Sequence, residues 1–275
     1  MIHGMTGDDG FSDWTLDDFD PARPSPARVY DYWLGGTYNF SADRELAERA
    51  IAAWPEIPQV MRQNRAFLQR AVRFLISVGI RQFLDLGSGI PTEGNVHQIA
   101  RQENPDTKIV YVDLDPVAVT HSRALVHDYD GVTVLQADLR EPEQVLKSNQ
   151  LQALLDLDKP VGVLMVAMLH FVADDEDPAG IVSRYRDALM PGSYLALSHA
   201  CRHHLEDFAV EHEQIYRRAG MTIRVRSLEE IAALFDGFQL VEPGLVPLPQ
   251  WRPEAESTWS DERPFPGAGG VGRKS

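Results

Sequence analysis

The chain has 275 residues, of which 44% are hydrophobic, and its 26 basic against 41 acidic side chains give a formal net charge of −15. A chain of this length and composition can bury one large core, so we expect a single elaborated domain. The negative charge disfavours nucleic acid as a partner, because the field of the whole molecule repels a polyanion.

Targeting and redox signals are sparse in this sequence. Residues 1–14 carry several aspartates and lack a basic flank followed by an apolar run, so no secretory signal is predicted. The longest apolar run, residues 161–169, is too short to span a bilayer. Cys201 is the single cysteine, which excludes an intramolecular disulfide and gives no sign of a cysteine-rich metal site. These features together predict a cytoplasmic protein without a membrane partner.

The first part of the chain reads as an acidic arm followed by helices. Residues 1–25 are rich in Gly, Asp and Pro and are predicted to form a loose arm. Helices are predicted over 27–34, 42–53 and 59–78, separated by Gly35-Gly36 and by Trp54-Pro55. In the third helix, apolar residues recur at spacings of three and four from Phe67 to Leu75. We therefore expect a helical cover over residues 26–78 and a core domain over 79–275.

Beyond Gly79, short apolar runs alternate with helical stretches, which is typical of a parallel sheet covered on both faces. The last predicted helix opens with a capping box formed by Ser227 and Glu230. The fold class is therefore α/β and Rossmann-like. The predicted strands are 82–86, 108–113, 132–136, 161–167, 194–198 and 238–241, and the predicted helices are 93–102, 116–126, 142–146, 179–189, 205–218 and 228–235.

A glycine turn, Asp85-Leu86-Gly87-Ser88-Gly89, follows the first predicted strand, where ligands bind in open α/β sheets. Glycines let a ligand approach the backbone closely, although a tight strand-to-helix turn can also use them for packing alone. Asp85 would repel the pyrophosphate of a dinucleotide, and Thr92 stands where the dinucleotide fingerprint has its third glycine. S-adenosylmethionine (SAM) has no phosphate and carries an ammonium and a sulfonium group, so Asp85 would attract it.

The next two predicted strands also end in aspartates. Asp113 lies roughly two dozen residues past the glycines, where a carboxylate can accept both ribose hydroxyls. Asp138 can accept a hydrogen bond from an adenine amino group, and Leu114 and Leu139 stand beside these acids. Asp115 fits better as a helix cap. Any one of these acids alone fits a helix cap or a solvated strand end equally well, but their ordered succession predicts an adenosyl site.

This order of motifs, over residues 82–198, resembles the class I SAM-dependent methyltransferases. The stretches 26–36, 39–44, 64–68 and 169–172 are similar to those of an actinobacterial group of methyltransferases, over nearly the whole chain. The resemblance implies a seven-stranded, mostly parallel sheet with helices on both faces, SAM as cofactor, and N-terminal helices over the pocket. It also implies a final antiparallel strand at 270–274, with Trp251-Arg252 lining the acceptor pocket.

The same resemblance implies which residues meet the cofactor. The helical cover would bring Tyr38, Asn39 and Asp43 to the pocket, and Arg65 could pair with the methionine carboxylate. A solvated helix arginine is the alternative for Arg65, and Asn64 shares that uncertainty. The expected cofactor-binding residues are Asp85, Gly87, Ser88, Gly89, Asp113, Leu114, Asp138, Leu139, Ala167, Asn64 and Arg65.

Two residues are candidates for catalysis. His170, at the carboxyl edge of the sheet, can accept a proton near neutral pH, although a structural histidine at a strand end is the alternative. Tyr38 on the cover is the second candidate. The group His199, His203, His204 and His212 lacks a third acidic or cysteine ligand at a recognisable spacing, so no metal is expected.

We therefore expect methyl transfer from SAM to a small-molecule acceptor by in-line displacement. Two alternatives stay open at this point. One is a SAM-binding regulator without turnover, because a fold alone does not fix an activity. The other is a nicotinamide-dependent oxidoreductase, which Asp85 and Thr92 disfavour.

Overall fold

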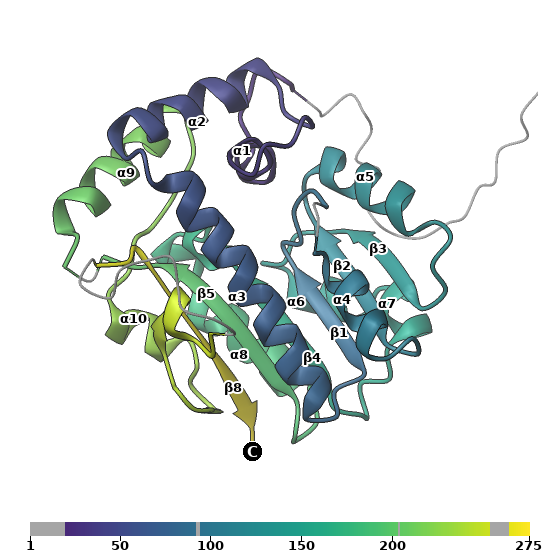
Figure 1. Cartoon of the computed structure of the whole chain (residues 1–275). Helices are drawn as coiled ribbons and strands as arrows, with labels where there is room; N and C mark the ends of the chain where they lie inside the picture. The colour runs from purple at the N-terminus through teal and green to yellow at the C-terminus, as the bar shows by residue number, and fades with distance from the viewer. Residues whose placement is uncertain (1–19, 92–93, 203, 254–263) are drawn as a thin grey trace, which may run out of the picture.

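The computed structural model describes residues 20–91, 94–202, 204–253 and 264–275. A central sheet carries helices on both faces, and α1 and α2 lie at the end of the molecule opposite the C-terminus (Figure 1). The strands are β1 Gln82–Leu86, β2 Lys108–Asp113, β3 Val132–Gln136, β4 Gly162–Val166, β5 Tyr194–Ala200, β6 Phe238–Leu240, β7 Val246–Pro247 and β8 Gly267–Lys274. The α-helices are α1 Pro26–Trp33, α2 Ser41–Ala53, α3 Ile57–Ser77, α4 Val96–Glu103, α5 Pro116–Val126, α6 Pro142–Leu146, α7 Asn149–Leu154, α8 Pro178–Asp187, α9 Glu206–Arg218 and α10 Leu228–Ala233, with short 3₁₀ helices η2 Leu169–Phe171, η3 Asp174–Glu176 and η4 Leu248–Gln250.

The sheet has eight strands in the order β3-β2-β1-β4-β5-β8-β6, with the two-residue β7 pairing with β8 beside this path. Strands β1 to β5 run parallel, and β8 runs antiparallel to β5. This mostly parallel sheet confirms the predicted fold class, with β7 as a strand more than expected. The chain returns from β3 across β1 to β4, so the carboxyl ends of β1 and its two neighbours form the crevice typical of a ligand site.

Strand β8 follows the expected final strand but begins three positions earlier, at Gly267. Its glycines are required by packing, because a Cβ added to Gly269 would lie 2.6 Å from the Leu248 side chain of η4. A glycine-rich segment that resembles a disordered tail in composition is therefore the strand that lets η4 lie close to the sheet.

The period of two along β1 sends its side chains into two separate cores. Phe83 packs with α3 and α4 on one face, while Leu84 and Leu86 pack with α7 and α8 on the other. Asp85 therefore points toward the face covered by α3, the same face as Tyr111 of β2. This alternation places a carboxyl group under the helix that carries Arg65.

A third core joins α1, α2 and α9 above the sheet. Its buried residues include Val29, Leu46, Ile57 and Tyr216. Helix α3 starts at this cluster and continues down the sheet, where it contacts α4, β4, β5 and β8. The cover is thus tied to the sheet by one long helix rather than by a flexible linker (Figure 1).

Three local expectations were wrong. Helix α4 begins at Val96 and not at residue 93, because Gly94 has a φ of +74° and Asn95 forms the cap. The short helix α7, capped by Ser148, was not predicted. Trp251 is fully buried between Phe67 and Phe74, so it packs in the core instead of lining a pocket.

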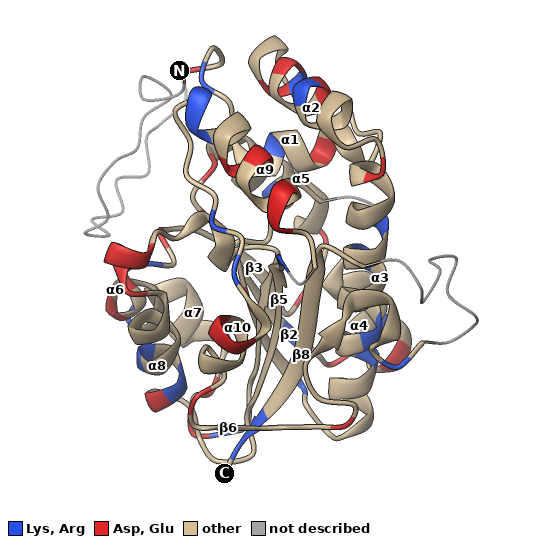
Figure 2. Ribbon diagram, turned by 90° about the vertical axis from the view of Figure 1, so that its left-hand side faces the viewer, with Lys and Arg blue, Asp and Glu red and all other residues tan. Residues whose placement is uncertain are grey.

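Helices α2 and α8 each carry both acidic and basic residues (Figure 2). Among the described helices, none is both long and apolar enough to cross a membrane. The described histidines, cysteine and acids also form no group of three that could hold a metal ion; His203 of the predicted histidine group, like Thr92, lies outside the described residues.

Candidate functional site

The glycine turn after β1 is held against β2 by backbone hydrogen bonds. The N–H groups of Gly87 and Ser88 donate to the Val112 carbonyl at 2.8 and 3.1 Å. Gly89 N–H donates to Oδ2 of Asp113 at 2.7 Å. Gly87 and Gly89 have φ values of +72° and +68°, which L side chains rarely adopt. The turn therefore needs glycine at both positions, and these hydrogen bonds hold its shape.

Gly87 also allows a close approach from β4. A Cβ at this position would lie 2.4 Å from Sδ of Met168. The Met168 thioether consequently covers the turn from the side of β4. Beside it, the buried Ser88 hydroxyl has no hydrogen-bond partner among the described residues. A polar ligand could supply that partner.

Two buried carboxyl groups face the turn. Burial raises the pKa of Asp85 to about 7, with Arg65 lowering it and Asp113 raising it. Burial likewise raises the pKa of Asp113 to about 6, against hydrogen bonds from the N–H groups of Asp115 and Gly89. Both acids therefore gain from a cation, because a cation stabilises the charged form that burial disfavours.

Asp138 lies at the third strand end and is already engaged. Its carboxylate accepts hydrogen bonds from Nε and Nη2 of Arg140, at 2.9 and 2.6 Å. The Arg140 guanidinium also donates to the carboxylate of Glu176 in η3. These contacts leave Asp138 with fewer free acceptor sites than the sequence implied. The ion-paired group forms one border of the cavity at this strand end.

These features surround one cavity of about 940 Å³ at the carboxyl ends of the strands. All eleven residues expected to meet the cofactor line it, and the two catalytic candidates are not among the lining residues. Lining residues that are not among the predicted site residues come from α1, from β4 through η2, and from the segment after α9. They include Tyr30, Met168, Phe171, Val172 and Met221.

Asn64 acts within a chain of hydrogen bonds across three elements. Its Nδ2 donates to the Tyr30 hydroxyl at 3.0 Å, and its Oδ1 accepts from the Ser198 hydroxyl at 2.6 Å. The Ser198 oxygen in turn accepts from Ala167 N–H at 2.9 Å. Ala167 has a φ of +56°, a conformation that persists only when neighbouring groups hold it. The chain thus fixes the end of β4 at the cavity wall.

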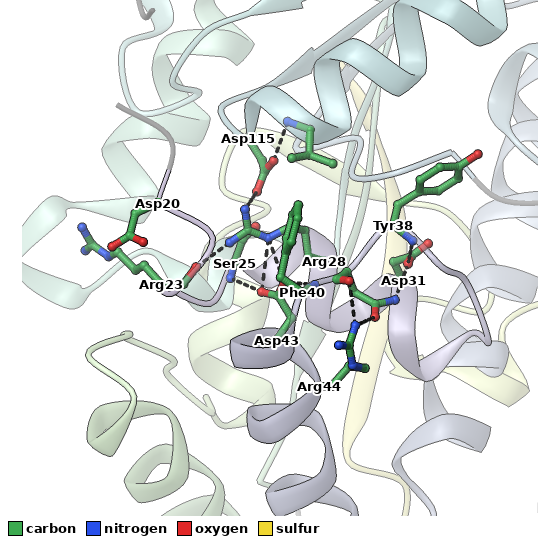
Figure 3. Close-up of polar contacts among 12 residues, drawn as sticks. Asp20, Arg23, Ser25, Arg28, Asp31, Tyr38, Phe40, Asp43, Arg44 and Asp115 are labelled. Carbon is green, nitrogen blue, oxygen red and sulfur yellow. Dashed lines mark hydrogen bonds and ion pairs between the residues drawn. The ribbon is translucent and has the colours of Figure 1, made fainter. Parts of the chain in front are cut away.

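The cover is fastened to the sheet by a buried arginine. Arg28 of α1 lies between Asp43 of α2 and Asp115 at the start of α5, with N–O distances of 3.0 and 3.7 Å (Figure 3). Asp43 is fully buried and also accepts from the N–H groups of Ser25 and Phe40. Because Asp115 is two residues from Asp113, this ion-pair cluster links the helical cover directly to the carboxylates of the turn.

Tyr38 lies on the outer side of the cover. The residue is 45% exposed, and its ring packs at a tilt of 42° against that of His121. Its N–H donates to the Asp31 carboxylate (Figure 3). Asp31 also explains Gly36, since a Cβ there would lie 2.0 Å from Oδ1 of Asp31. This motif therefore builds the loop between α1 and α2, and it directs Tyr38 toward α5.

His170 lies in a buried group behind the cavity. Its Nδ1 accepts weakly from Ala200 N–H at 3.4 Å, and its ring packs edge-on against His199. Burial lowers the pKa of His170 well below its usual value. Arg226 fastens the same segment through the Leu169 carbonyl and Asp174. These contacts are those of a side chain that orders η2.

A Rossmann-like sheet with this strand order, a glycine turn followed by acids at successive strand ends, and a cavity over those ends define a class I methyltransferase. The chain belongs to the S-adenosyl methyltransferase family, whose model matches residues 12–275. It is therefore a SAM-dependent methyltransferase. A comparison with curated proteins gives no match.

Solved structures agree with this assignment. A candidate methyltransferase from Thermobifida fusca is 40% identical with a TM-score of 0.89, over 96% of this chain and 100% of the other. A DUF574 family protein from Streptomyces avermitilis is 37% identical with a TM-score of 0.88, over 93% and 99% of the two chains. Human N-acetylserotonin methyltransferase, in complex with SAM, is 16% identical with a TM-score of 0.50 over 92% of this chain and 63% of that chain, and shares the fold alone.

Proposed function

We propose that the enzyme transfers the methyl group of SAM to a small-molecule acceptor that binds in the same cavity. The observation that carries this proposal is the convergence of the eleven expected cofactor residues on one cavity of about 940 Å³. A cavity of this size is near the upper end of the range for small-molecule sites, which leaves room for an acceptor beside the cofactor.

The cofactor residues divide by the chemistry of SAM. Asp85 and Arg65 suit the ammonium and the carboxylate of its methionine part. The two oxygens of Asp113 each accept one backbone N–H, and each retains a lone pair for a ribose hydroxyl. The Ser88 hydroxyl is a further buried polar group that SAM can satisfy.

Three residues of the set suit the adenine. Leu114 and Leu139 supply apolar walls at the ends of β2 and β3. Asp138 supplies an acceptor beside them, in addition to its pairing with Arg140. Asn64 and Ala167 act by holding the end of β4 in position.

When bound, SAM supplies an electrophilic methyl group on its sulfonium. The chain then has to align the acceptor with that group and exclude water, and such positioning accounts for much of the acceleration in reactions of this kind. The helical cover serves both needs, because α1 and α3 contribute Tyr30 and Leu68 to the lining. His170 and Tyr38 do not line the cavity, so our proposal assigns neither a proton transfer.

A small molecule fits the acceptor site better than nucleic acid. The net charge of −15 opposes a polyphosphate. Among the described lining residues, carboxylates also outnumber guanidinium groups. The acceptor is therefore expected to be a metabolite that enters beneath the cover.

Calorimetry tests the proposal with three ligands: SAM, S-adenosylhomocysteine and NAD. We expect the first two to bind and NAD to give no heat, and the reverse result would refute the cofactor assignment.

Asp113→Asn should weaken the binding of S-adenosylhomocysteine by about tenfold, since a charged hydrogen bond contributes roughly 1.5 kcal/mol. Asp128→Asn, on an exposed turn, is the control. Transfer of labelled methyl from SAM to metabolite extracts tests the small-molecule acceptor.

A further inference from the structure

The cavity has two chemically different halves, which the strand order separates. The carboxylates and glycines of the predicted cofactor site come from the ends of β1, β2 and β3. Strand β4 lies on the other side of β1. The residues contributed from that side and from the cover include a mostly apolar group, Tyr30, Met168, Phe171, Val172 and Met221, which we call the acceptor wall.

The acceptor wall is apolar and firmly supported. Phe171 and Met221 pack against the core formed by α1, α2 and α9, and the Phe171 ring lies 6.0 Å from that of Tyr216. The one polar atom of the wall's side chains, the Tyr30 hydroxyl, already bonds to Asn64 and to the Met61 carbonyl. The wall therefore offers rings and thioethers, which contact aromatic molecules favourably.

The charges around this wall disfavour an anion. Asp175 and Glu176 of η3 lie beside it in the lining, and the two deep acids Asp85 and Asp113 lie across the cavity. Four arginines line the cavity. Arg28 and Arg140 are already paired with carboxylates, Arg65 is assigned to the methionine carboxylate of the cofactor, and Arg23 is exposed to solvent. A carboxylate or phosphate on the acceptor would therefore lose its hydration and meet mostly negative charge.

We infer that the methyl acceptor is an uncharged, ring-containing molecule whose apolar body lies against the acceptor wall. This inference rests on the proposed function, and it adds the chemical class of the acceptor. An apolar ring gains from burial on this wall, whereas the residues of the wall itself offer no cation to repay the desolvation of an anionic group on the same ring.

The test uses the protein saturated with S-adenosylhomocysteine and a matched pair of probes, 2-naphthol and 2-naphthoate, which differ in charge at neutral pH. Binding is measured by calorimetry and by saturation-transfer NMR. We expect 2-naphthol to bind at least about tenfold more tightly, because the anion leaves a buried charge uncompensated. Equal or tighter binding of 2-naphthoate overturns the inference.

Two variants then locate the probe. Met221→Lys adds a cation to the wall and should raise the affinity for 2-naphthoate by about tenfold, while Phe171→Ala should weaken 2-naphthol by about tenfold. Val210→Lys makes the same charge change on α9 at a side chain that is 58% exposed and outside the lining. If Met221→Lys and Val210→Lys have the same effect, the acceptor wall is not the binding surface.

Titration of S-adenosylhomocysteine alone distinguishes failure of the proposed function from failure of the acceptor class. Failure of this titration contradicts the proposed function. Normal cofactor binding without discrimination between the naphthalene probes contradicts only the acceptor class.

Discussion

Several residues at this site have buried polar groups that suit a ligand and do not stabilise the fold. Asp85 is only 6% exposed, so its carboxyl group is poorly hydrated and its charged form is disfavoured. Gly87 has the Met168 side chain where a Cβ would lie, and Ser88 has a buried hydroxyl without a partner among the described residues. Such groups lower the stability of the free protein and become favourable when a polar cation binds.

The pH dependence of stability should reveal the cost of Asp85. Burial raises its pKa to about 7, so between about pH 4 and 7 the folded protein keeps a proton that the unfolded chain has released. The free energy of unfolding should therefore fall as the pH rises through this range. Asp85→Asn removes this contribution and should be more stable than the wild type by about 4 kcal/mol at pH 8, with convergence near pH 4.

Urea unfolding at pH 5 and pH 8 measures this difference. Asp106→Asn, at an exposed turn before β2, serves as the control and should follow the wild type. A wild-type and an Asp85→Asn protein with the same dependence on pH would contradict the assignment of a protonated Asp85. The same variant should bind S-adenosylhomocysteine more weakly, because it lacks the charge that attracts the ammonium group.

Secondary-structure elements divide between those that carry the cofactor residues and those that close the cavity. The ends of β1 to β3 are rigid because each is hydrogen-bonded within the sheet. The cover is joined to the start of α5 by the buried cluster of Arg28, Asp43 and Asp115. The position of α1 over the cavity should therefore depend on Arg28.

Arg28→Met should lower the free energy of unfolding by about 3 kcal/mol, because it leaves the buried Asp43 carboxylate without its cation. Arg44→Met is the matched control on the same cover. Its guanidinium makes exposed hydrogen bonds to Asn39, so the loss should be less than about 1 kcal/mol. Denaturant unfolding compares the two, and hydrogen exchange of residues 20–33 reports whether the cover loosens. Equal losses in both variants would contradict the role given to Arg28.

At the scale of the whole molecule, the net charge of −15 has its own consequence. Acidic residues outnumber basic ones along the chain, so self-repulsion opposes the folded state. Surface ion pairs such as Lys159–Asp156 act in the opposite direction, but exposed pairs contribute little. Repulsion should be the larger of the two effects.

Added salt should therefore stabilise the protein. Raising sodium chloride from about 20 mM to about 300 mM shortens the screening length several-fold. We expect the melting temperature to rise by about 2–4 °C, which corresponds to roughly 1 kcal/mol for a chain of this size. Calorimetry in sodium and potassium chloride checks this and separates screening from binding of a particular cation. A fall in melting temperature would indicate that ion pairs outweigh repulsion.

The sequence predicted well those features that depend on neighbours along the chain. Strands β1, β2 and β3 have the predicted bounds, because each is a short apolar run limited by polar or turn residues. The order of Asp85, Asp113 and Asp138 relative to these strands also follows from the sequence alone, since parallel strands place their carboxyl ends at one edge. Fold class and cofactor were consequently accessible without coordinates.

Only the tertiary structure decided which side chains meet. Asn64 and Ser198 are 134 positions apart and share a hydrogen bond, and no local pattern encodes such a pair. The glycine-rich composition of β8 resembles that of a disordered tail, and only the packing of η4 against it explains the glycines. His170 follows a strand end, as a catalytic base would, but its ring is buried against His199 and does not line the cavity. Local periodicity fixes the elements and the strand ends, whereas burial, pairing and the acceptor wall arise from contacts between segments that are distant in the chain.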